Sequence, residues 1–217
     1  MPAAPGVGPM PPDHDAANDA TRADRILDTA LALGELRGWE SLHLHHIARE
    51  LDIPLSEIHR HFRQKDDLTE AWFDRADRAL LAVSEMPGWT ELAPRERLFQ
   101  AITAWLDALR PHRRLTRAML GYKLHPEHLH LQAHGLTRIS RTVQWIREVA
   151  QLPATGVRQE AEEVVLTSIY LATLGQWLRD ESPHSSATRK LLQRLLGTAE
   201  SVANGVGRWL PGSPRES

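Results

Sequence analysis

The chain has 217 residues and a formal net charge of −2, with 26 basic and 28 acidic side chains and no cysteine. The length fits one large domain or two small ones, and the charge balance gives no global sign of a nucleic-acid partner. Without cysteine the chain has no disulfide, no thiolate nucleophile and no Cys-ligated zinc. Residues 1–20 lack the basic and apolar regions of a secretory signal, and no apolar run is long enough for a membrane span. We therefore expect a cytoplasmic protein with a disordered N-terminal tail.

From residue 21 onward, apolar residues recur at intervals of three and four, which is typical of amphipathic helices, and no segment alternates as a strand does. The pattern predicts short helices that begin near Thr21, Leu44 and Pro54, and a longer one from Lys65 to just before Pro87. Later helices are expected over residues 94–110, 115–125, 136–152, 164–181 and 185–199. The sequence thus predicts an all-α fold of nine helices.

Residues 47–68, IARELDIPLSEIHRHFRQKDDL, are the most informative stretch. Two short apolar-periodic segments meet at Asp52-Ile53-Pro54, as in a helix-turn-helix. Ala48 is small enough to let the two flanking helices approach closely. The residues expected to seal three short helices around one small core are Ile47, Ala48, Ile53, Ile58 and Phe62.

Residues 22–80 resemble the DNA-binding domain of the tetracycline repressor (TetR) family of bacterial regulators. The matching positions are Ile26-Leu27, Ala30, Gly38-Trp39, Ile47-Ala48, Asp52-Ile53, Ile58, Phe62, Lys65 and Leu68. The resemblance implies a helix-turn-helix DNA-binding domain over 21–68 and a helical ligand-binding and dimerisation domain over 69–203. The residues that follow, 204–217, are expected to form a flexible tail. It implies a transcriptional regulator, in particular a repressor, that binds double-stranded operator DNA.

In a helix-turn-helix the second helix lies in the major groove, where its exposed side chains meet base edges. Arg60 could pair with guanine or phosphate, and the histidines can donate or accept. Lys65 resembles the family's phosphate-contacting lysine. By position, the residues expected to contact DNA are His43, His45, Leu55, Ser56, Glu57, His59, Arg60, His61 and Lys65.

Four positions depart from the family pattern. Asp52 stands for the turn glycine, which is tolerable because aspartate accepts the left-handed conformation better than most residues. Pro54 replaces a capping hydroxyl, and His59 replaces an aromatic residue. Glu57 places a carboxylate on the reading helix, which is unfavourable there unless it accepts a hydrogen bond from a cytosine amine.

The helix-turn-helix segment is also not strongly basic. Acidic residues outnumber lysines and arginines by nine to seven over residues 21–68, although phosphate neutralisation supplies most non-specific DNA affinity. Histidines soften this deficit, because nearby phosphates raise the imidazole pKa; they are His43, His45, His46, His59 and His61. The reading face is therefore expected to be weakly basic.

The C-terminal half offers apolar and aromatic residues that could either line a ligand pocket or simply form core. The resemblance implies a small apolar effector bound there, and the candidate lining residues are Trp105, Met119, Tyr122, Trp145, Tyr170, Leu174 and Trp177. The last two long helices carry more apolar residues than one buried stripe needs, which favours a homodimer through these helices. The residues behind that expectation are Ile169, Leu174, Trp177, Leu178, Leu191, Leu195 and Leu196.

A second likeness leaves an alternative open. Residues 164–196, with the earlier WLDALRPHRRLTRAML, look like the C-terminal half of ubiquinone-biosynthesis accessory proteins, which bind isoprenoid lipid with the same fold and without DNA. The residues that carry it are Tyr170-Leu171-Ala172-Thr173, Trp177-Leu178, Asp180, Ser182-Pro183 and Thr188. Those proteins end in a long amphipathic membrane helix, whereas ANGVGRWLPG is too short and interrupted, so no stable membrane insertion is expected.

Histidines also gather between residues 125 and 134, and a metal-responsive regulator is a third possibility. The cluster comprises His125, His128, His130 and His134, with Glu127 as the nearby carboxylate, and an incidental origin is favoured, so no metal and no cofactor are expected. His43, His45 and His46 are read as surface residues. Since no phosphate loop, HExxH or nucleophile motif occurs, the chain is not expected to be an enzyme.

Overall fold

The computed structural model describes residues 14–123, 129–152 and 157–209, with no β-strand in these ranges. The first four helices are α1 (His14–Arg37), α2 (Leu44–Glu50), α3 (Leu55–His61) and α4 (Lys65–Ala82). Two 3-10 turns follow, η1 (Val83–Glu85) and η2 (Trp89–Glu91), and then α5 (Pro94–Leu109), η3 (Arg110–His112), α6 (Arg113–Lys123) and α7 (Leu129–Ala150). The chain ends with α8 (Val157–Trp177), η5 (Pro183–Ser185) and α9 (Ser186–Trp209). The predicted all-α fold is confirmed.

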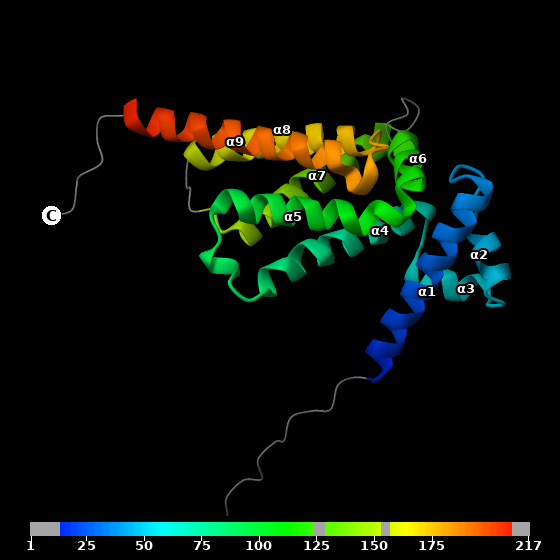
Figure 1. Ribbon diagram of the computed structural model, residues 1–217. Coiled ribbons are helices and arrows are strands. Elements are labelled where there is room, and N and C mark those ends of the chain that lie inside the picture. Colours follow the sequence, from blue (N-terminus) through cyan, green and yellow to red (C-terminus); the bar gives the residue numbers. More distant parts are fainter. Residues whose placement is uncertain (1–13, 124–128, 153–156, 210–217) are drawn as a thin grey trace, which may run out of the picture.

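The helix-turn-helix forms one end of the molecule, and α5 to α9 form a helical bundle at the other (Figure 1). Helix α4 belongs to both, because it packs on α1 as well as on α5 and α7. Its buried face carries Leu68, Trp72, Phe73, Ala76 and Leu80, which all belong to one continuous core. Helix α4 therefore joins the two parts of the molecule, and α6 adds a second contact with α1.

The small core of the helix-turn-helix is formed by the residues that the sequence indicates. Ile47, Ala48, Ile58 and Phe62 are buried, and Ile53 is half-buried against them. Gly38, with φ +84°, ends α1 in the left-handed conformation. Asp52 takes the same region with φ +51°, so the expectation that aspartate can stand for the turn glycine is confirmed. The turn between α2 and α3 thus has its usual geometry without glycine.

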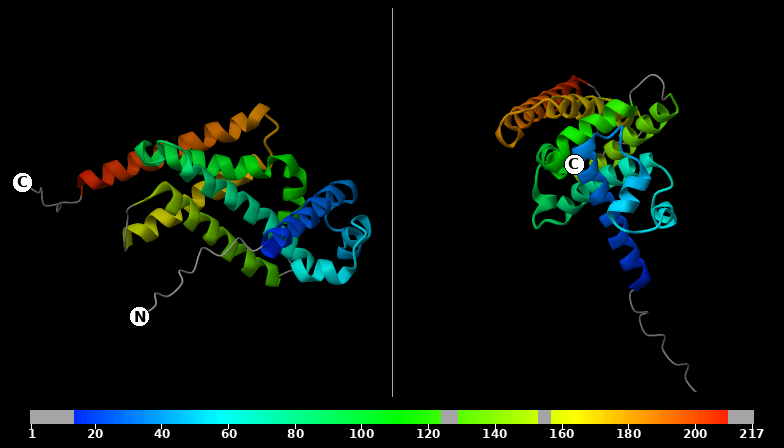
Figure 2. Two further views of the ribbon diagram at one scale, coloured as in Figure 1. Left: turned by 90° about the horizontal axis from the view of Figure 1, so that it is seen from below. Right: turned by 90° about the vertical axis from the view of Figure 1, so that its right-hand side faces the viewer.

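Three helix ends differ from the prediction. α1 begins at His14, so residues 14–20 are helical where a disordered tail was expected, and its first turns project beyond the rest of the domain (Figures 1 and 2). Acidic residues near a helix N-terminus are favoured by the helix dipole, and HDAANDA supplies two of them. α7 begins at Leu129 rather than near 136, and α9 continues to Trp209, into the segment expected to be a flexible tail.

α8 and α9 lie side by side along one flank of the bundle and run in opposite directions (Figures 1 and 2). The junction between them is fixed by Asp180. Its Oδ2 accepts hydrogen bonds from the backbone N–H of Thr188 at 2.8 Å and from the Thr188 hydroxyl at 2.6 Å. Its Oδ1 accepts from the Ser182 backbone N–H at 2.9 Å, while Ser182 Oγ accepts from the Ala187 N–H at 3.0 Å. The first turn of α9 is therefore capped by side chains from the α8–α9 loop.

Candidate DNA interface

The reading helix α3 begins directly after Pro54, whose backbone is extended at φ −67° and ψ 149°. Ile58 is fully buried and fixes which face of α3 points inward. The opposite face carries Leu55, which is 51% exposed, and the exposed residues Ser56, His59 and Arg60. These four predicted contact residues therefore share one outward face, as readout in a major groove requires.

Glu57 and His61, also predicted to contact DNA, turn back toward α1 instead. The Glu57 carboxylate accepts a hydrogen bond from Arg22 at 3.0 Å and lies 3.4 Å from Arg60. His61 Nε2 lies 3.8 Å from the same carboxylate and 3.7 Å from Asp19, and it has no hydrogen-bond partner among the described residues. The side chain of Glu57 is 14% exposed and that of His61 is 4% exposed. Both line the seam between α1 and α3.

The histidines at the start of α2 form a cluster of three rings. The His45 and His46 ring centroids are 4.2 Å apart, and His43 lies 5.4 and 5.3 Å from them. His46 Nδ1 accepts a hydrogen bond from the His43 backbone N–H at 3.3 Å, which caps the helix. Partial burial, then the nearby His45 and Arg37, lower the pKa of His46, so its neutral form is favoured. His43 and His45 remain exposed, on the predicted interface.

Lys65 begins α4, as expected, and its side chain is bound to the backbone of the same domain. Its Nζ donates to the backbone carbonyls of Trp39 at 2.7 Å, Glu40 at 3.1 Å and Leu42 at 3.2 Å. The ammonium group also lies 5.4 Å from the centre of the Trp39 ring. Partial burial lowers the Lys65 pKa. In this conformation the side chain holds the loop between α1 and α2, and its contact with phosphate stays a prediction.

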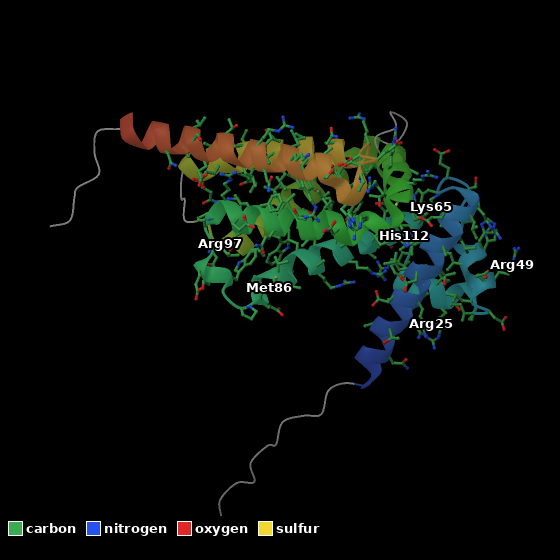
Figure 3. The ribbon with its side chains drawn as sticks, viewed as in Figure 1. Arg25, Arg49, Lys65, Met86, Arg97 and His112 are labelled. Atoms are coloured by element: carbon green, nitrogen blue, oxygen red, sulfur yellow. The ribbon has the colours of Figure 1, made fainter. Side chains whose placement is uncertain are left out.

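Two exposed arginines of the helix-turn-helix, Arg49 and Arg63, were not in the predicted set. Arg49 lies at the end of α2 and projects from the outer side of the domain, as Figure 3 shows. Arg63 follows α3 directly, and its backbone N–H donates to Asp67 at 2.8 Å. Their place in the last turn of α2 and just after α3 could have marked them, since both are cations of the helix-turn-helix segment.

Five of the seven candidate ligand residues of the C-terminal half lie in the packed core. Trp105, Met119, Tyr170, Leu174 and Trp177 are all buried. Of the remaining two, Trp145 is 42% exposed on α7, and the side chain of Tyr122 lies outside the described residues. The residues Ile169, Leu174, Trp177 and Leu196, which suggested a dimer face, are likewise buried within their own chain. These four residues therefore do not supply an exposed apolar face, and the dimer through the last two helices stays a prediction.

A charged group that sequence reasoning missed lies at the centre of this core. Asp77 accepts hydrogen bonds from Trp105 Nε1 at 2.8 Å and from Thr142 at 3.2 Å, and it pairs with Arg138 at 2.9 Å. Burial raises the pKa of Asp77, and nearby Arg138 opposes that shift. The sequence held one signal of it, because Asp77 follows Phe73 by four residues and so lies on the buried face of α4.

The same network ties α4 to α7. Arg138 is 8% exposed and also contacts Glu70 and Asp74, while its guanidinium group lies 5.5 Å from the centre of the Phe73 ring. The Phe73 and Trp105 rings stack with centroids 5.9 Å apart. Trp105 in turn meets Tyr170 edge to face at 5.4 Å. Aromatic residues from α4, α5 and α8 therefore surround a buried ion pair.

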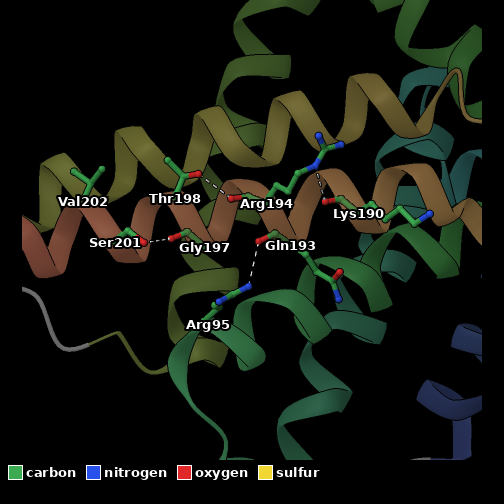
Figure 4. A pocket seen from close by; sticks show the side chains of 8 residues that line it. All are labelled: Arg95, Lys190, Gln193, Arg194, Gly197, Thr198, Ser201 and Val202. Carbon is green, nitrogen blue, oxygen red and sulfur yellow. Dashed lines mark hydrogen bonds between the residues drawn. The ribbon is translucent and has the colours of Figure 1, made fainter.

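A groove of about 860 Å³ lies elsewhere, on the outer side of α9 next to the start of α5 (Figure 4). Arg95 reaches across it from α5 and lies over Gly197, where its guanidinium group is 3.4 Å from the carbonyl oxygen of Gln193. The residues that line the groove are Arg95, Lys190, Gln193, Arg194, Gly197, Thr198, Ser201 and Val202. None of them belongs to the predicted ligand set.

The described side chains contain no group of three or more metal-ligating residues close enough to hold a metal ion. The predicted histidine cluster at His125, His128, His130 and His134 lies outside the residues whose side chains are described. None of the described helices is both long and apolar enough to cross a membrane.

The comparisons agree with this geometry. A profile of the family described as "Bacterial regulatory proteins, tetR family" matches residues 26–72. A TetR transcriptional regulator from Nitrosomonas europaea ATCC 19718 is 45% identical, and its structure has a TM-score of 0.75 over 83% of this chain and 99% of that one. Among curated proteins, no significant match is found.

More distant structures share the fold alone. A TetR transcriptional regulator from Rhodococcus sp. RHA1 is 18% identical with a TM-score of 0.57, over 82% of this chain and 97% of that one. A transcriptional regulator from Aquifex aeolicus VF5 is 14% identical with a TM-score of 0.54, over 83% and 99%.

The likeness to ubiquinone-biosynthesis accessory proteins finds no support in these matches, and Asp180, Ser182 and Thr188, which carried part of it, cap α9. The family consists of regulators rather than enzymes, so the prediction that the chain is not an enzyme is confirmed. The identity to the Nitrosomonas protein over almost its whole length, together with the helix-turn-helix, shows that this chain belongs to the TetR family of DNA-binding transcriptional regulators.

Proposed function

We propose that the protein is a homodimeric repressor that binds operator DNA through α3 and releases it when a small apolar molecule enters the C-terminal bundle. The observation that carries the DNA part is the single outward face of α3, on which Ser56, His59 and Arg60 are exposed while Ile58 is buried. Exposed polar side chains on a helix that can enter the major groove are what base readout needs.

The proposal of ligand control is supported by the course of α4. Phe73 and Asp77 of α4 contact Trp105 of α5, and Trp72, one residue before Phe73, donates to Thr116 of α6 at 2.9 Å. Arg75, near the middle of α4, holds α1, because it pairs with Asp24 at 2.9 Å and with Asp28 at 2.6 Å. A molecule that separated Trp105 from α4 would therefore shift α4, and with it α1 and the helix-turn-helix. Such coupling requires that the ligand bind the two arrangements unequally.

The proposal of a homodimer is supported by the outward face of α8. Val164 and Val165 are 66% and 46% exposed, Leu171 is 41% exposed, and Ala161 and Ala172 share this face. Large exposed apolar residues in one stripe mark a surface for association. The spacing of the stripe follows the helical repeat, so one packed partner could cover all of it.

Charge on the two helices fits a second copy related by a two-fold axis. α8 begins with the acidic residues Glu160 and Glu163, whereas the first half of α9 exposes Lys190 and Arg194. Because α8 and α9 are antiparallel, an α8 from a second copy that crosses this α8 in the opposite direction would bring its acidic end toward these cations. The same arrangement would present two α3 helices on one side, as palindromic DNA requires.

The test is a gel shift with the full-length protein and duplex DNA from upstream of its own gene. A retarded complex that weakens steeply with salt is expected. Native mass spectrometry of the same preparation should identify any co-purified apolar molecule, and an organic extract containing it should release the DNA. Isoprenoid lipid in the preparation together with no shift at low salt would contradict the proposal and would favour a lipid-binding accessory role.

A further inference from the structure

The reading helix α3 contains one acidic residue, and that residue does not share the outward face. Glu57 has a side chain that is 14% exposed, whereas Arg60, one turn later, is 68% exposed. The carboxylate thus lies in the seam between α1 and α3, away from the exposed face of α3. The position of Glu57 in the sequence suggests an unfavourable approach of its carboxylate to DNA. In this conformation the carboxylate does not point that way.

Both carboxylate oxygens of Glu57 are engaged by cations. Oε1 accepts a hydrogen bond from Arg22 of α1 at 3.0 Å, and His61 Nε2 lies 3.8 Å from the same oxygen. Oε2 lies 3.4 Å from Arg60, in an i,i+3 pair within α3. One carboxylate therefore offsets two guanidinium groups, one of them the arginine on the reading face.

We propose that Glu57 is a specificity-determining residue of the DNA interface, which restrains Arg22 and Arg60 from pairing with phosphates irrespective of sequence. This inference rests on the DNA-binding function of the protein. Phosphate contacts supply affinity without sequence information, whereas an arginine that meets a guanine edge with two hydrogen bonds discriminates between bases. A carboxylate beside Arg60 lowers the affinity that comes from phosphate contacts.

Because the ion pair between Glu57 and Arg60 is weak, Arg60 can still leave it to contact a guanine edge. An ion pair that is this exposed contributes little, because water and salt screen it and both side chains are mobile. A guanine that offers two acceptors in the fixed geometry of the guanidinium group can replace it. A phosphate offers a similar charge at every base step, so the restraint from Glu57 acts mainly against binding to unrelated sequences.

The test compares Glu57→Gln with wild type on two duplexes of equal length, the upstream DNA and a scrambled version, by fluorescence anisotropy between 50 and 200 mM salt. The variant is expected to bind the scrambled duplex more tightly and to lose about threefold or more of the ratio between the two affinities. Its salt slope on the scrambled duplex should steepen by about 0.9 for each released arginine that meets a phosphate. With one such contact, the affinity of the variant for the scrambled duplex should fall about threefold more than that of wild type between 50 and 200 mM salt.

Glu50→Gln is the matched control. Glu50 is an exposed carboxylate at the end of α2, so its loss changes the charge of the same domain equally without touching Arg22 or Arg60. Glu57→Asp keeps the charge and is expected to retain most of the wild-type ratio. Arg22→Ala leaves Arg60 as the arginine paired with the carboxylate and should make the scrambled complex weaker than in wild type.

Equal effects of Glu57→Gln and Glu50→Gln, in a protein that binds the upstream duplex, would overturn this inference and leave the DNA-binding function standing. A wild-type protein that binds neither duplex at low salt would instead contradict the proposed function itself. Thermal unfolding of each variant shows whether the fold is retained. If Glu57→Gln acted by disturbing the fold, Glu57→Asp would also be expected to lose binding, whereas a charge effect spares Glu57→Asp.

Discussion

The ammonium group of Lys65 lies 2.7 Å from the carbonyl oxygen of Trp39, and it donates to two further carbonyls of the loop between α1 and α2. A residue that begins α4 therefore fixes the loop that precedes α2. The position of the reading helix depends on this loop, because α2 and α3 pack on one shared core.

Replacing Lys65 by Met is expected to lower the free energy of unfolding by about 1–3 kcal/mol, since part-buried carbonyls would lose their donor. Urea unfolding of the full chain measures this. A variant with unchanged stability but a salt slope on DNA lower by about 0.9 would show instead that Lys65 acts by contacting a phosphate.

Asp180 should contribute to stability mainly as an ionised cap of α9. Burial works against its charge, but the hydrogen bonds from Ser182 and Thr188 outweigh this and lower the pKa of Asp180 well below its usual range. A depressed folded-state pKa means that the stabilisation is present above the unfolded pKa of about 4 and is lost as the pH falls toward the folded value. Urea midpoints measured from pH 6 down to pH 3 should fall accordingly.

Asp180→Asn is the variant that isolates this group. The amide can replace only part of the acceptor set, so a loss of about 2 kcal/mol at pH 7 is expected. Its midpoints should also depend less on pH below 5 than those of wild type. Parallel pH profiles for the two proteins would contradict the assignment of Asp180 as the ionised cap.

Replacing Leu171 by Arg tests the proposed dimer face. A cation placed on the apolar stripe of α8 would have to be buried without a partner in the dimer, so the variant is expected to be monomeric by light scattering. Met86→Arg is the control, because Met86 is 53% exposed directly after η1, far from α8 and α9 (Figure 3). The proposed face would be wrong if the Leu171 variant stayed dimeric, or if both variants dissociated.

The helix-turn-helix was predictable because its signals are local. The spacing of Ile47, Ile58 and Phe62 determines which side of each short helix faces inward, and the outward position of Arg60 follows from it. The directions of Glu57 and Lys65 were not predictable. Their partners lie 35 and 26 residues away in the sequence, so their orientation depends on tertiary packing.

The C-terminal half shows a different limit. Aromatic periodicity marks Trp105, Tyr170 and Trp177 as inward-facing, and they are buried. The pattern does not distinguish a residue that packs against neighbours from one that lines a cavity, because both face inward. Asp77 was missed for a related reason, since its partners Trp105, Thr142 and Arg138 come from two other helices.

The most direct test of DNA recognition by α3 is the salt dependence of binding to the upstream duplex, compared between wild type and Arg60→Ala. The side chain of Arg60 is 68% exposed, so its removal should leave the free energy of unfolding within about 0.5 kcal/mol of wild type. Affinity for the upstream duplex should fall by at least tenfold, with most of the preference over a scrambled sequence lost. An Arg60→Ala protein that bound the upstream duplex with wild-type affinity and preference would contradict the assignment of α3 as the reading helix.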